Sequence, residues 1–381
     1  MQLDYTLVVF SHLRWDFVLQ RPQHLLSRLA ACHPVLFIEE PAYTDSSRSF
    51  WECSRPASGV LVCRPRTPVE EGGFSGPQLD LLGPMVADLV RREAAGATVA
   101  WFYTPMALPL AAAFSPDAIV YDCMDELSLF AGAPPELLPR ERELMERADV
   151  VFTGGPSLYE ARRGRHPNIH CFPSSVDAAH FHQALTGLLP EPADQADLPH
   201  PRLGFYGVID ERLDRDIIDR LATAHPEWQI VMVGPVVKID PASLPRQPNI
   251  LYTGQRTYDE LPSYLAGWDV SLLPFAQNDA TRFISPTKTL EYMVAERPIV
   301  STPIRDVAGP YGDIVYLGAT PDEFVRACET ALASGRQERE RRATLMQRVI
   351  ERTSWDRTAA EMDRLISQAL AGRLRTTARA G

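Results

Sequence analysis

Short apolar runs recur along the whole chain, separated by stretches long enough for one helix or a loop. They lie at 7–10, 35–38, 60–63, 98–103, 119–122 and 150–153, and again at 203–206, 230–233, 250–252, 270–273, 299–300 and 314–316. Runs of this length that are apolar at nearly every position are typical of strands buried on both faces, and helices between them indicate parallel sheets. The pattern predicts an α/β protein with two such sheets.

The pattern stops at 183–201, which is rich in proline and has no clear periodicity. We interpret this stretch as a domain boundary, because 381 residues are enough for two domains that each bury a core. We predict Rossmann-like domains at 1–182 and 183–354, with a last helix, 355–381, packing back on the first domain. Residues 39–83 are irregular apart from 60–63, and we expect either an acceptor-binding lip or a disordered surface excursion.

Composition excludes several classes of protein. With 38 basic and 49 acidic residues the net charge is −11, so a nucleic-acid partner is not expected. The six cysteines are scattered without a C-x-x-C pair, which favours reduced thiols over disulfides or zinc ligands. An acidic residue precedes the first apolar run, and no run reaches the ~18 apolar residues of a membrane span. We expect a cytoplasmic protein and leave peripheral contact with the membrane open.

The chemically richest stretch is 281–303. Ser285 followed by Pro286 is typical of a helix start, and the apolar positions that follow at helical spacing would pack this helix on a sheet, with Lys288 and Glu291 pointing away. A helix N-terminus and a lysine in its first turn suit a phosphate, and a glutamate one turn later suits ribose hydroxyls. The alternative is a surface ion pair between Lys288 and Glu291. Lysine is rare in this chain, in which Lys238 is the only lysine besides Lys288.

This stretch, Ser-Pro-Thr-Lys-Thr-Leu-Glu-Tyr-Met-Val-Ala-Glu-Arg-Pro-Ile-Val, resembles the donor-site signature of GT-B glycosyltransferases, in particular the large retaining group that includes glycogen synthases and bacterial envelope glycosyltransferases. The resemblance implies that Glu291 binds the ribose and that Ser285, Pro286, Thr287 and Lys288 hold the diphosphate. Phe283 stands where many members have a second glutamate, and Glu296-Arg297 replaces a segment that contains glycine in the family. The resemblance also implies donor contacts at Gly207, Arg212 and Gly254.

In the first half, polar and aromatic residues follow the predicted strands. His12, Arg14 and Trp15 follow the first strand, and Tyr103 follows the run at 98–103. Ligands of doubly wound sheets bind at the carboxyl ends of strands, so a sugar could stack on Trp15, a phosphate could meet Arg14, and His12 could move a proton. Trp15 as a loop anchor and His12 as a plain loop residue are the alternatives. We predict Arg14, Trp15 and Tyr103 as acceptor-binding.

Three carboxylates, Asp122, Asp125 and Glu126, crowd the end of the next predicted strand. They would repel one another unless a cation or a hydroxyl-rich ligand lies among them, which favours a site over a plain turn. We predict Asp125, His12 and Lys288 as the catalytic residues.

The resemblance implies transfer of a sugar from a nucleotide-sugar donor, a UDP-sugar by preference, to a cell-envelope polysaccharide or lipid-linked acceptor. It also implies retention of configuration without an enzyme nucleophile. No cofactor or metal is expected, because the helix start, Lys288 and Arg212 would supply the positive charge for the leaving diphosphate. Two alternatives stay open: a UDP-amino-sugar epimerase of the same fold, which the carboxylate cluster suggests, and a non-catalytic nucleotide-sugar-binding scaffold, which Phe283 suggests.

Overall fold

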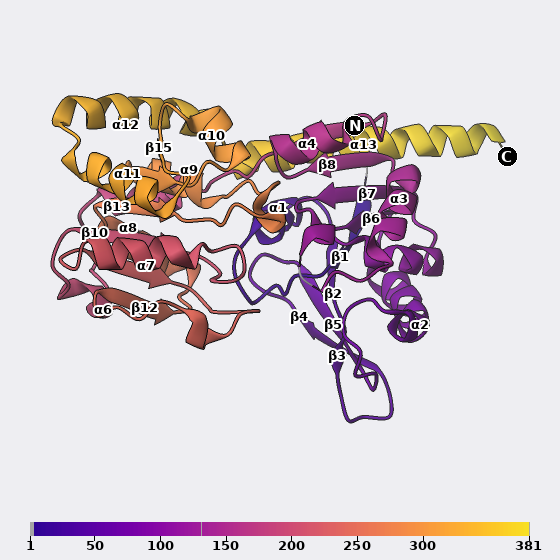
Figure 1. The fold of residues 1–381 in the computed structure, drawn as a ribbon. Coiled ribbons are helices and arrows are strands. Elements are labelled where there is room, and N and C mark those ends of the chain that lie inside the picture. Colours follow the sequence, from indigo (N-terminus) through magenta and orange to yellow (C-terminus); the bar gives the residue numbers. More distant parts are fainter. Residues whose placement is uncertain (1–3, 131, 381) are drawn as a thin grey trace. The chain divides into compact units, whose positions relative to one another are not determined.

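The computed structural model describes residues 4–130 and 132–380, which form two compact units (Figure 1). The first unit comprises the chain up to Pro173 together with the segment from Trp355 onward, and the second comprises Ser174–Ser354. Each unit has its own sheet and its own apolar core.

The sheet of the first unit has nine strands. They are β1 (Tyr5–Ser11), β2 (Val35–Glu39), β3 (Ala42–Tyr43), β4 (Phe50–Ser54), β5 (Leu61–Thr67), β6 (Ala97–Phe102), β7 (Ala118–Cys123), β8 (Val150–Thr153) and β9 (Ile169–Cys171). Their order is β3-β5-β2-β1-β6-β7-β8-β9, with β4 added to β5. All neighbours are parallel except β4, which pairs antiparallel to β5. The carboxyl ends of the parallel strands therefore meet at one edge.

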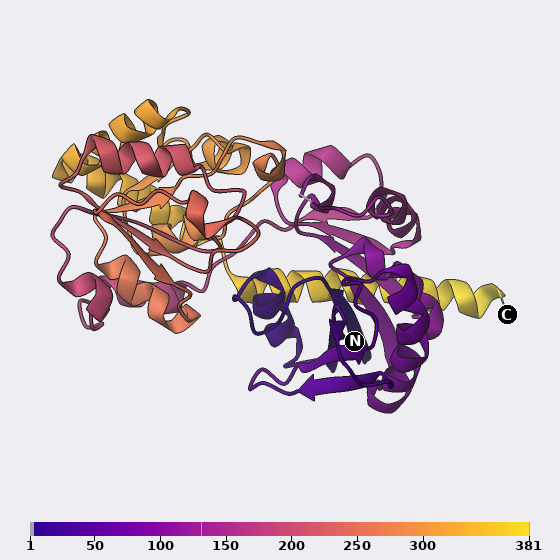
Figure 2. The same cartoon turned by 60° about the horizontal axis from the view of Figure 1, so that its bottom comes forward.

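Helices cover both faces of this sheet. On one face α1 (Arg21–Leu29) lies beside α13 (Trp355–Ala380), and both pack on apolar side chains of the strands (Figure 2). The remaining helical segments of the unit are α2 (Gly76–Glu93), η1 (Pro105–Ala113), η2 (Leu127–Leu129), α3 (Leu137–Arg147) and α4 (Pro156–Arg162).

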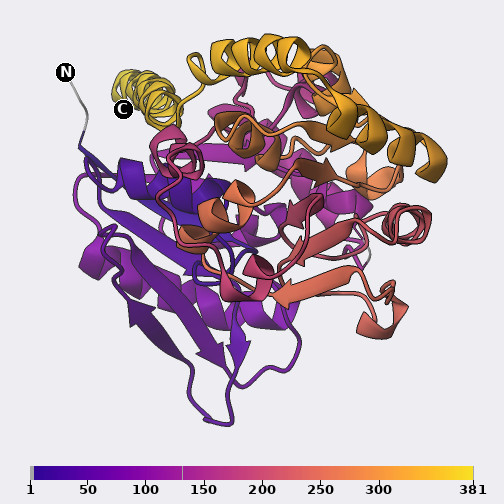
Figure 3. The same ribbon diagram turned by 90° about the vertical axis from the view of Figure 1, so that its left-hand side faces the viewer.

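The sheet of the second unit has six parallel strands in the order β12-β11-β10-β13-β14-β15 (Figure 3). They are β10 (Arg202–Tyr206), β11 (Gln229–Val233), β12 (Ile250–Gly254), β13 (Val270–Leu273), β14 (Ile299–Ser301) and β15 (Tyr316–Leu317). The chain starts in the middle, builds outward to β12, and then returns to the other side of β10. This is a Rossmann-like order, and its direction reverses between β10 and β13, where doubly wound sheets bind ligands.

The helical segments of the second unit alternate with these strands. They are α5 (Ala178–His182), η3 (Gln183–Leu185), α6 (Ala193–Ala196), α7 (Arg215–Ala224), η4 (Pro241–Ser243), η5 (Tyr258–Glu260), α8 (Leu261–Ala266), η6 (Asp279–Thr281), α9 (Lys288–Val294), α10 (Arg305–Tyr311), α11 (Pro321–Ala333) and α12 (Arg336–Ile350). Helices α7 and α11 pack against each other, and α9 contacts α5 and α12.

Two features of the organisation differ from the sequence prediction. The division between the units falls after Pro173, not at 182, because Phe181 and Ala184 are buried in the core of the second unit. The proline-rich stretch is also no free linker: Gln195 in α6 is fully buried, and its side-chain oxygen accepts a hydrogen bond of 2.8 Å from the indole of Trp268.

The region 39–83 is more regular than predicted. It contains β3, β4 and the start of α2 in addition to β5. The sequence pattern does not predict strand β4, because this strand lies at the edge of the sheet and is exposed or half-buried throughout. It therefore lacks the apolar run that identifies the central strands.

Candidate active site

Three glycines close the carboxyl ends of β10, β11 and β12. Gly207, Gly234 and Gly254 all have positive φ, at 134°, 144° and 75°. The amide of Gly234 donates to the carbonyl of Gly254 at 2.9 Å, and a Cβ on Gly234 would lie 1.9 Å from the carbonyl oxygen of Gly207. Only glycine permits this close approach of two strand ends. The edge of the sheet is therefore lined by backbone groups at this point.

Helix α9 begins at Lys288, later than the predicted start at Ser285 and Pro286. The predicted cap is wrong, because Ser285 and Pro286 precede the helix and are not part of it. Ser174 holds this segment instead: its hydroxyl donates to the carbonyl of Ser285 at 3.0 Å and accepts from the hydroxyl of Thr287 at 3.1 Å.

The Lys288 side chain lies over the end of β10. A Cβ on Gly207 would come within 2.2 Å of the Lys288 Cε, so the stem of the lysine occupies the space that the glycine leaves open. The ammonium lies 5.6 Å from the ring centre of Phe205 and 5.9 Å from that of Phe275, within reach of cation–π attraction. Since Phe205 belongs to β10 and Phe275 follows β13, the Lys288 charge lies at the reversal of strand order.

Glu291 is buried, with 6% of its surface exposed, and its Oε2 accepts a hydrogen bond of 2.8 Å from the hydroxyl of Tyr206 at the end of β10. The prediction that Lys288 and Glu291 point away from the packed side of the helix is therefore wrong, and so is the alternative of a surface ion pair. Helix α9 is buried at every position from Thr289 to Val294, which an amphipathic pattern does not predict.

Burial shifts both charged groups toward neutral pH. It raises the pKa of Glu291 to about 7, although the Tyr206 hydroxyl and the charge of Lys288 act in the opposite direction. Burial and, to a smaller extent, the nearby charge of Arg212 lower the pKa of Lys288 to about 8. Two groups that change charge near neutral pH, in contact with a strand end, are typical of a functional site.

Arg212 lies in the loop after β10 and is held by Asp210. Its Nε lies 3.0 and 3.1 Å from the two carboxylate oxygens and its Nη2 lies 2.7 Å from one of them. The same loop is braced by the amide of Ala276, which donates to the Arg212 carbonyl at 2.8 Å. The loop therefore keeps a second cation close to Lys288 in a fixed geometry.

In the first unit, a buried glutamate organises the loop after β1. Glu39 Oε2 accepts from Arg14 at 3.1 Å and from Arg64 at 2.6 Å, while its Oε1 accepts from the amide of Trp15 at 2.7 Å. Trp15 is only 9% exposed, and its ring meets Phe37 edge-on with ring centres 5.0 Å apart. This burial favours the alternative in which Trp15 anchors its loop.

His12 and Asp125 both follow strands at the carboxyl edge of this sheet, after β1 and β7, and both are half-buried. Tyr103 follows β6 but is 1% exposed, so its ring cannot meet an acceptor in this conformation. Burial raises the pKa of the Tyr103 hydroxyl well above its ordinary value, and the charge of Asp122 adds to the effect.

Arginines of the chain itself neutralise two of the three clustered carboxylates. Arg21 Nε and Nη2 each bind one oxygen of Asp122 at 3.0 Å, with both side chains buried. Arg162 binds Glu126 at 2.5 Å and also Glu141 at 2.8 Å. The repulsion that suggested a ligand at this point is thus relieved within the fold.

Sequence reasoning missed Tyr206, Asp210 and Ser174. Tyr206 reads as one more apolar residue of a buried strand, and the partner of its hydroxyl depends on how α9 packs. Asp210 stands two positions before Arg212, a spacing that allows the observed contact but does not require it.

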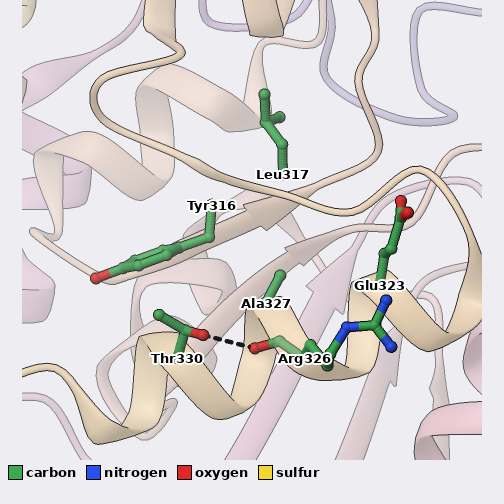
Figure 4. A pocket seen from close by; sticks show the side chains of 6 residues that line it. All are labelled: Tyr316, Leu317, Glu323, Arg326, Ala327 and Thr330. Atoms are coloured by element: carbon green, nitrogen blue, oxygen red, sulfur yellow. Dashed lines mark hydrogen bonds between the residues drawn. The ribbon is translucent and has the colours of Figure 1, made fainter.

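A hollow of about 320 Å³ lies elsewhere in the second unit, between β15 and α11 (Figure 4). It is lined by Tyr316, Leu317, Glu323, Arg326, Ala327 and Thr330, none of which belongs to the candidate site. Within residues 4–130 and 132–380 no three or more His, Cys, Asp or Glu side chains gather as a metal ion would require. No helix in the same ranges is long and apolar enough to cross a membrane.

Known proteins resemble this chain in sequence and in fold. Residues 201–334 match the family described as glycosyl transferases group 1. A proposed teichuronic acid biosynthesis glycosyltransferase of Bacillus subtilis (strain 168), TuaH, is 26% identical over 278 residues, which cover 68% of this chain and 69% of that protein.

Several solved structures match nearly the whole chain. A sucrose-phosphate synthase from Thermosynechococcus elongatus has a TM-score of 0.70 at 13% identity, covering 96% of this chain and 99% of its own. A structure of trehalose-6-phosphate from E. coli bound with UDP-2-fluoro glucose has a TM-score of 0.67 at 14% identity, with the same coverage. The predicted fold class is confirmed, because the chain forms two Rossmann-like units and matches structures of the GT-B fold. The chain has the GT-B fold, and its residues 201–334 match the family of glycosyl transferases group 1.

Proposed function

We propose that this protein transfers a sugar from a nucleoside diphosphate sugar, with UDP as the favoured nucleotide, to a cell-envelope polysaccharide or a lipid-linked acceptor. The observation that carries the donor half is the placement of Lys288 and Glu291 at the strand reversal of the second unit. The B. subtilis relative, named for teichuronic acid biosynthesis, supports the acceptor class. The E. coli structure with a UDP-sugar analogue supports the nucleotide.

The leaving nucleoside diphosphate gains negative charge as the bond between the sugar and the phosphate oxygen breaks. Lys288 is the charge that would stabilise it, and Arg212 is a second cation nearby. Positive charge held in a fixed, poorly solvated position stabilises such a transition state more than the same charge in water. These two groups would act without a metal, and we propose that none is needed.

Glu291 would accept hydrogen bonds from the ribose hydroxyls, a role that needs its ionised form. We propose that the new glycosidic bond forms on the face from which the diphosphate leaves, which gives retention. The acceptor hydroxyl must lose its proton in this step, and His12 and Asp125 remain the candidates to orient or deprotonate it.

Calorimetric titration of the intact protein with UDP, GDP and ADP, each free and as its sugar, tests the donor half. We expect UDP or its sugars to bind, and Glu291→Gln and Lys288→Ala to abolish binding. Glu323→Gln, a matched change of another glutamate in the second unit that lies in the separate hollow, should bind as the wild type does. A Glu291→Gln variant that binds the nucleotide unchanged would remove the basis of the proposal.

The pH dependence of binding is a second test. Glu291, with a pKa of about 7, is mostly protonated at pH 6 and mostly ionised above pH 7, so affinity should rise about sixfold from pH 6 to about pH 7.5. Above the Lys288 pKa of about 8 the ammonium is lost and affinity should fall. We therefore expect a bell-shaped profile with its optimum between these values, measured as the dissociation constant of the nucleotide. A flat profile would show that neither group contacts the ligand.

The epimerase alternative rests on the carboxylate cluster, and two members of that cluster are bound by arginines. NMR of the UDP-sugar with enzyme and no acceptor separates the two reactions, because only an epimerase converts the sugar. The scaffold alternative predicts binding without turnover, so release of UDP from the donor would exclude it.

A further inference from the structure

Two cysteines face each other across the edge of the first sheet. In the antiparallel pairing of β4 with β5, Cys53 lies directly opposite Cys63, and their sulfur atoms are 3.5 Å apart. Cys53 is exposed and Cys63 is fully buried. Directly opposed residues of an antiparallel pair have a Cα separation of about 4.5 to 5.5 Å, which lies within the range that a disulfide spans. Contraction of the sulfur distance to about 2.05 Å needs no change of register.

We propose that Cys53 and Cys63 are a redox modification site, which a hydroperoxide converts into a reversible intrachain disulfide. The exposed Cys53 thiolate attacks one peroxide oxygen, the O–O bond breaks, and the sulfur becomes a sulfenic acid. The sulfur of Cys63 then attacks the Cys53 sulfur, the S–O bond breaks, and water leaves with the thiol proton. In total, two thiols lose two electrons and two protons, and one hydrogen peroxide becomes two waters.

The difference in burial determines which cysteine reacts with the peroxide and which one then forms the disulfide. Exposure lets Cys53 meet the oxidant, whereas burial raises the pKa of Cys63 well above its ordinary value and keeps it from reacting first. Cys63 lies at the end of the β2–β5 pairing, on a strand whose Arg64 binds Glu39. The disulfide would therefore fasten the exposed edge strand to a strand that is anchored in the core.

The sequence makes the product simple to detect. Trypsin cleaves after Arg48 and Arg66, but the bonds Arg55-Pro56 and Arg64-Pro65 resist it. Both cysteines therefore leave the protein in one peptide, 49–66. Chymotrypsin, which cleaves after Leu61, then separates the two cysteines unless a disulfide joins them.

The experiment treats the reduced, intact protein with hydrogen peroxide and maps its peptides by mass spectrometry without reduction. We expect peptide 49–66 to lose two hydrogen atoms, its chymotryptic halves to stay linked, and dithiothreitol to reverse both changes. Cys53→Ser should prevent the change, while Cys32→Ser, a matched change of another exposed cysteine, should leave it intact. Higher oxidation of Cys53 without a link, a link between two chains, or no change in this peptide would each overturn the proposal.

Discussion

The buried carboxylates at the carboxyl edges of the two sheets differ in how far neighbouring positive charges compensate them. In the first unit, Asp122 and its partner Arg21 form a two-pronged ion pair, so both buried charges are compensated. In the second unit, Glu291 has one hydrogen bond from Tyr206 and a lysine nearby, and burial still moves its pKa to about 7. Loss of one member of a compensated pair leaves a buried charge without its partner, whereas an incompletely compensated charge can still bind a ligand. This difference distinguishes an architectural cluster of charges from a candidate site.

The largest effect is expected from breaking the ion pair between Asp122 and Arg21. Asp122→Asn should destabilise the first unit by about 3 to 5 kcal/mol, because it leaves Arg21 buried without its counter-charge. Chemical denaturation measures the change. Asp88→Asn is the matched control, since its pairs with Arg91 and Arg92 are exposed and should contribute under about 1 kcal/mol. Equal losses from both variants would mean that Asp122 is no more important than a surface charge.

The corresponding change in the second unit should have the opposite sign. The raised pKa of Glu291 means that the folded protein keeps a proton that the unfolded chain releases between pH 4.5 and about 7, so this group lowers stability as pH rises through that window. Glu291→Gln removes the ionisation and should stabilise the protein by about 3 kcal/mol at pH 8, with little effect at pH 4.5. Denaturation at both pH values measures it, and a destabilised variant at pH 8 would contradict the comparison.

Tyr206→Phe sharpens the comparison without removing a charge. The Tyr206 hydroxyl lowers the pKa of Glu291, so its loss, at ~1 kcal/mol for one hydrogen bond, should raise that pKa and weaken nucleotide binding at pH 7 by about threefold. The loss should shrink at pH 8, where Glu291 ionises in either protein. Tyr252→Phe, which loses a hydrogen bond to the carbonyl of Pro245, should leave binding unchanged. Binding that is equally weak at both pH values would indicate a packing effect instead.

The smallest expected effect concerns the end of α9. Glu296 belongs to the pair Glu296-Arg297 that replaces the glycine-containing segment of the GT-B signature. Its φ is 51°, a left-handed conformation that disfavours a side chain. Its carboxylate accepts a hydrogen bond of 2.6 Å from Gln347, which offsets part of the strain. Glu296→Gly should therefore stabilise the protein by only about 0.5 kcal/mol. Thermal denaturation beside Glu296→Gln, which keeps the conformation, separates strain from the lost contact.

The central strands of both sheets could be predicted from the sequence, because each is apolar at nearly every position and bounded by polar residues. Strand β4 could not, since an edge strand such as Phe50–Ser54 needs no apolar run. The start of α9 was also mispredicted. Ser285 and Pro286 have the local signature of a helix start, but the tertiary contact with Ser174 holds them outside the helix.

The candidate donor residues could be predicted from the resemblance to a family signature. Their burial and their contacts could not be predicted from that signature. Local spacing indicates that Lys288 and Glu291 share one side of a helix, but burial depends on what packs around that helix. For the same reason Trp15 could be read as a stacking surface, although the amide contact with Glu39 and the packing on Phe37 hold its ring inside.

The first unit is assembled from two separate parts of the chain, since α13 lies beside α1 although the whole second unit stands between them in sequence. During synthesis on the ribosome, the second unit can fold as one continuous segment, whereas the first cannot complete its core until α13 has emerged. At about 5–20 residues per second, this leaves the apolar face that receives α13 uncovered for on the order of ten seconds or more. A chaperone can bind this apolar face only in that interval, and truncation within α13 should lower the soluble yield because the face then stays uncovered.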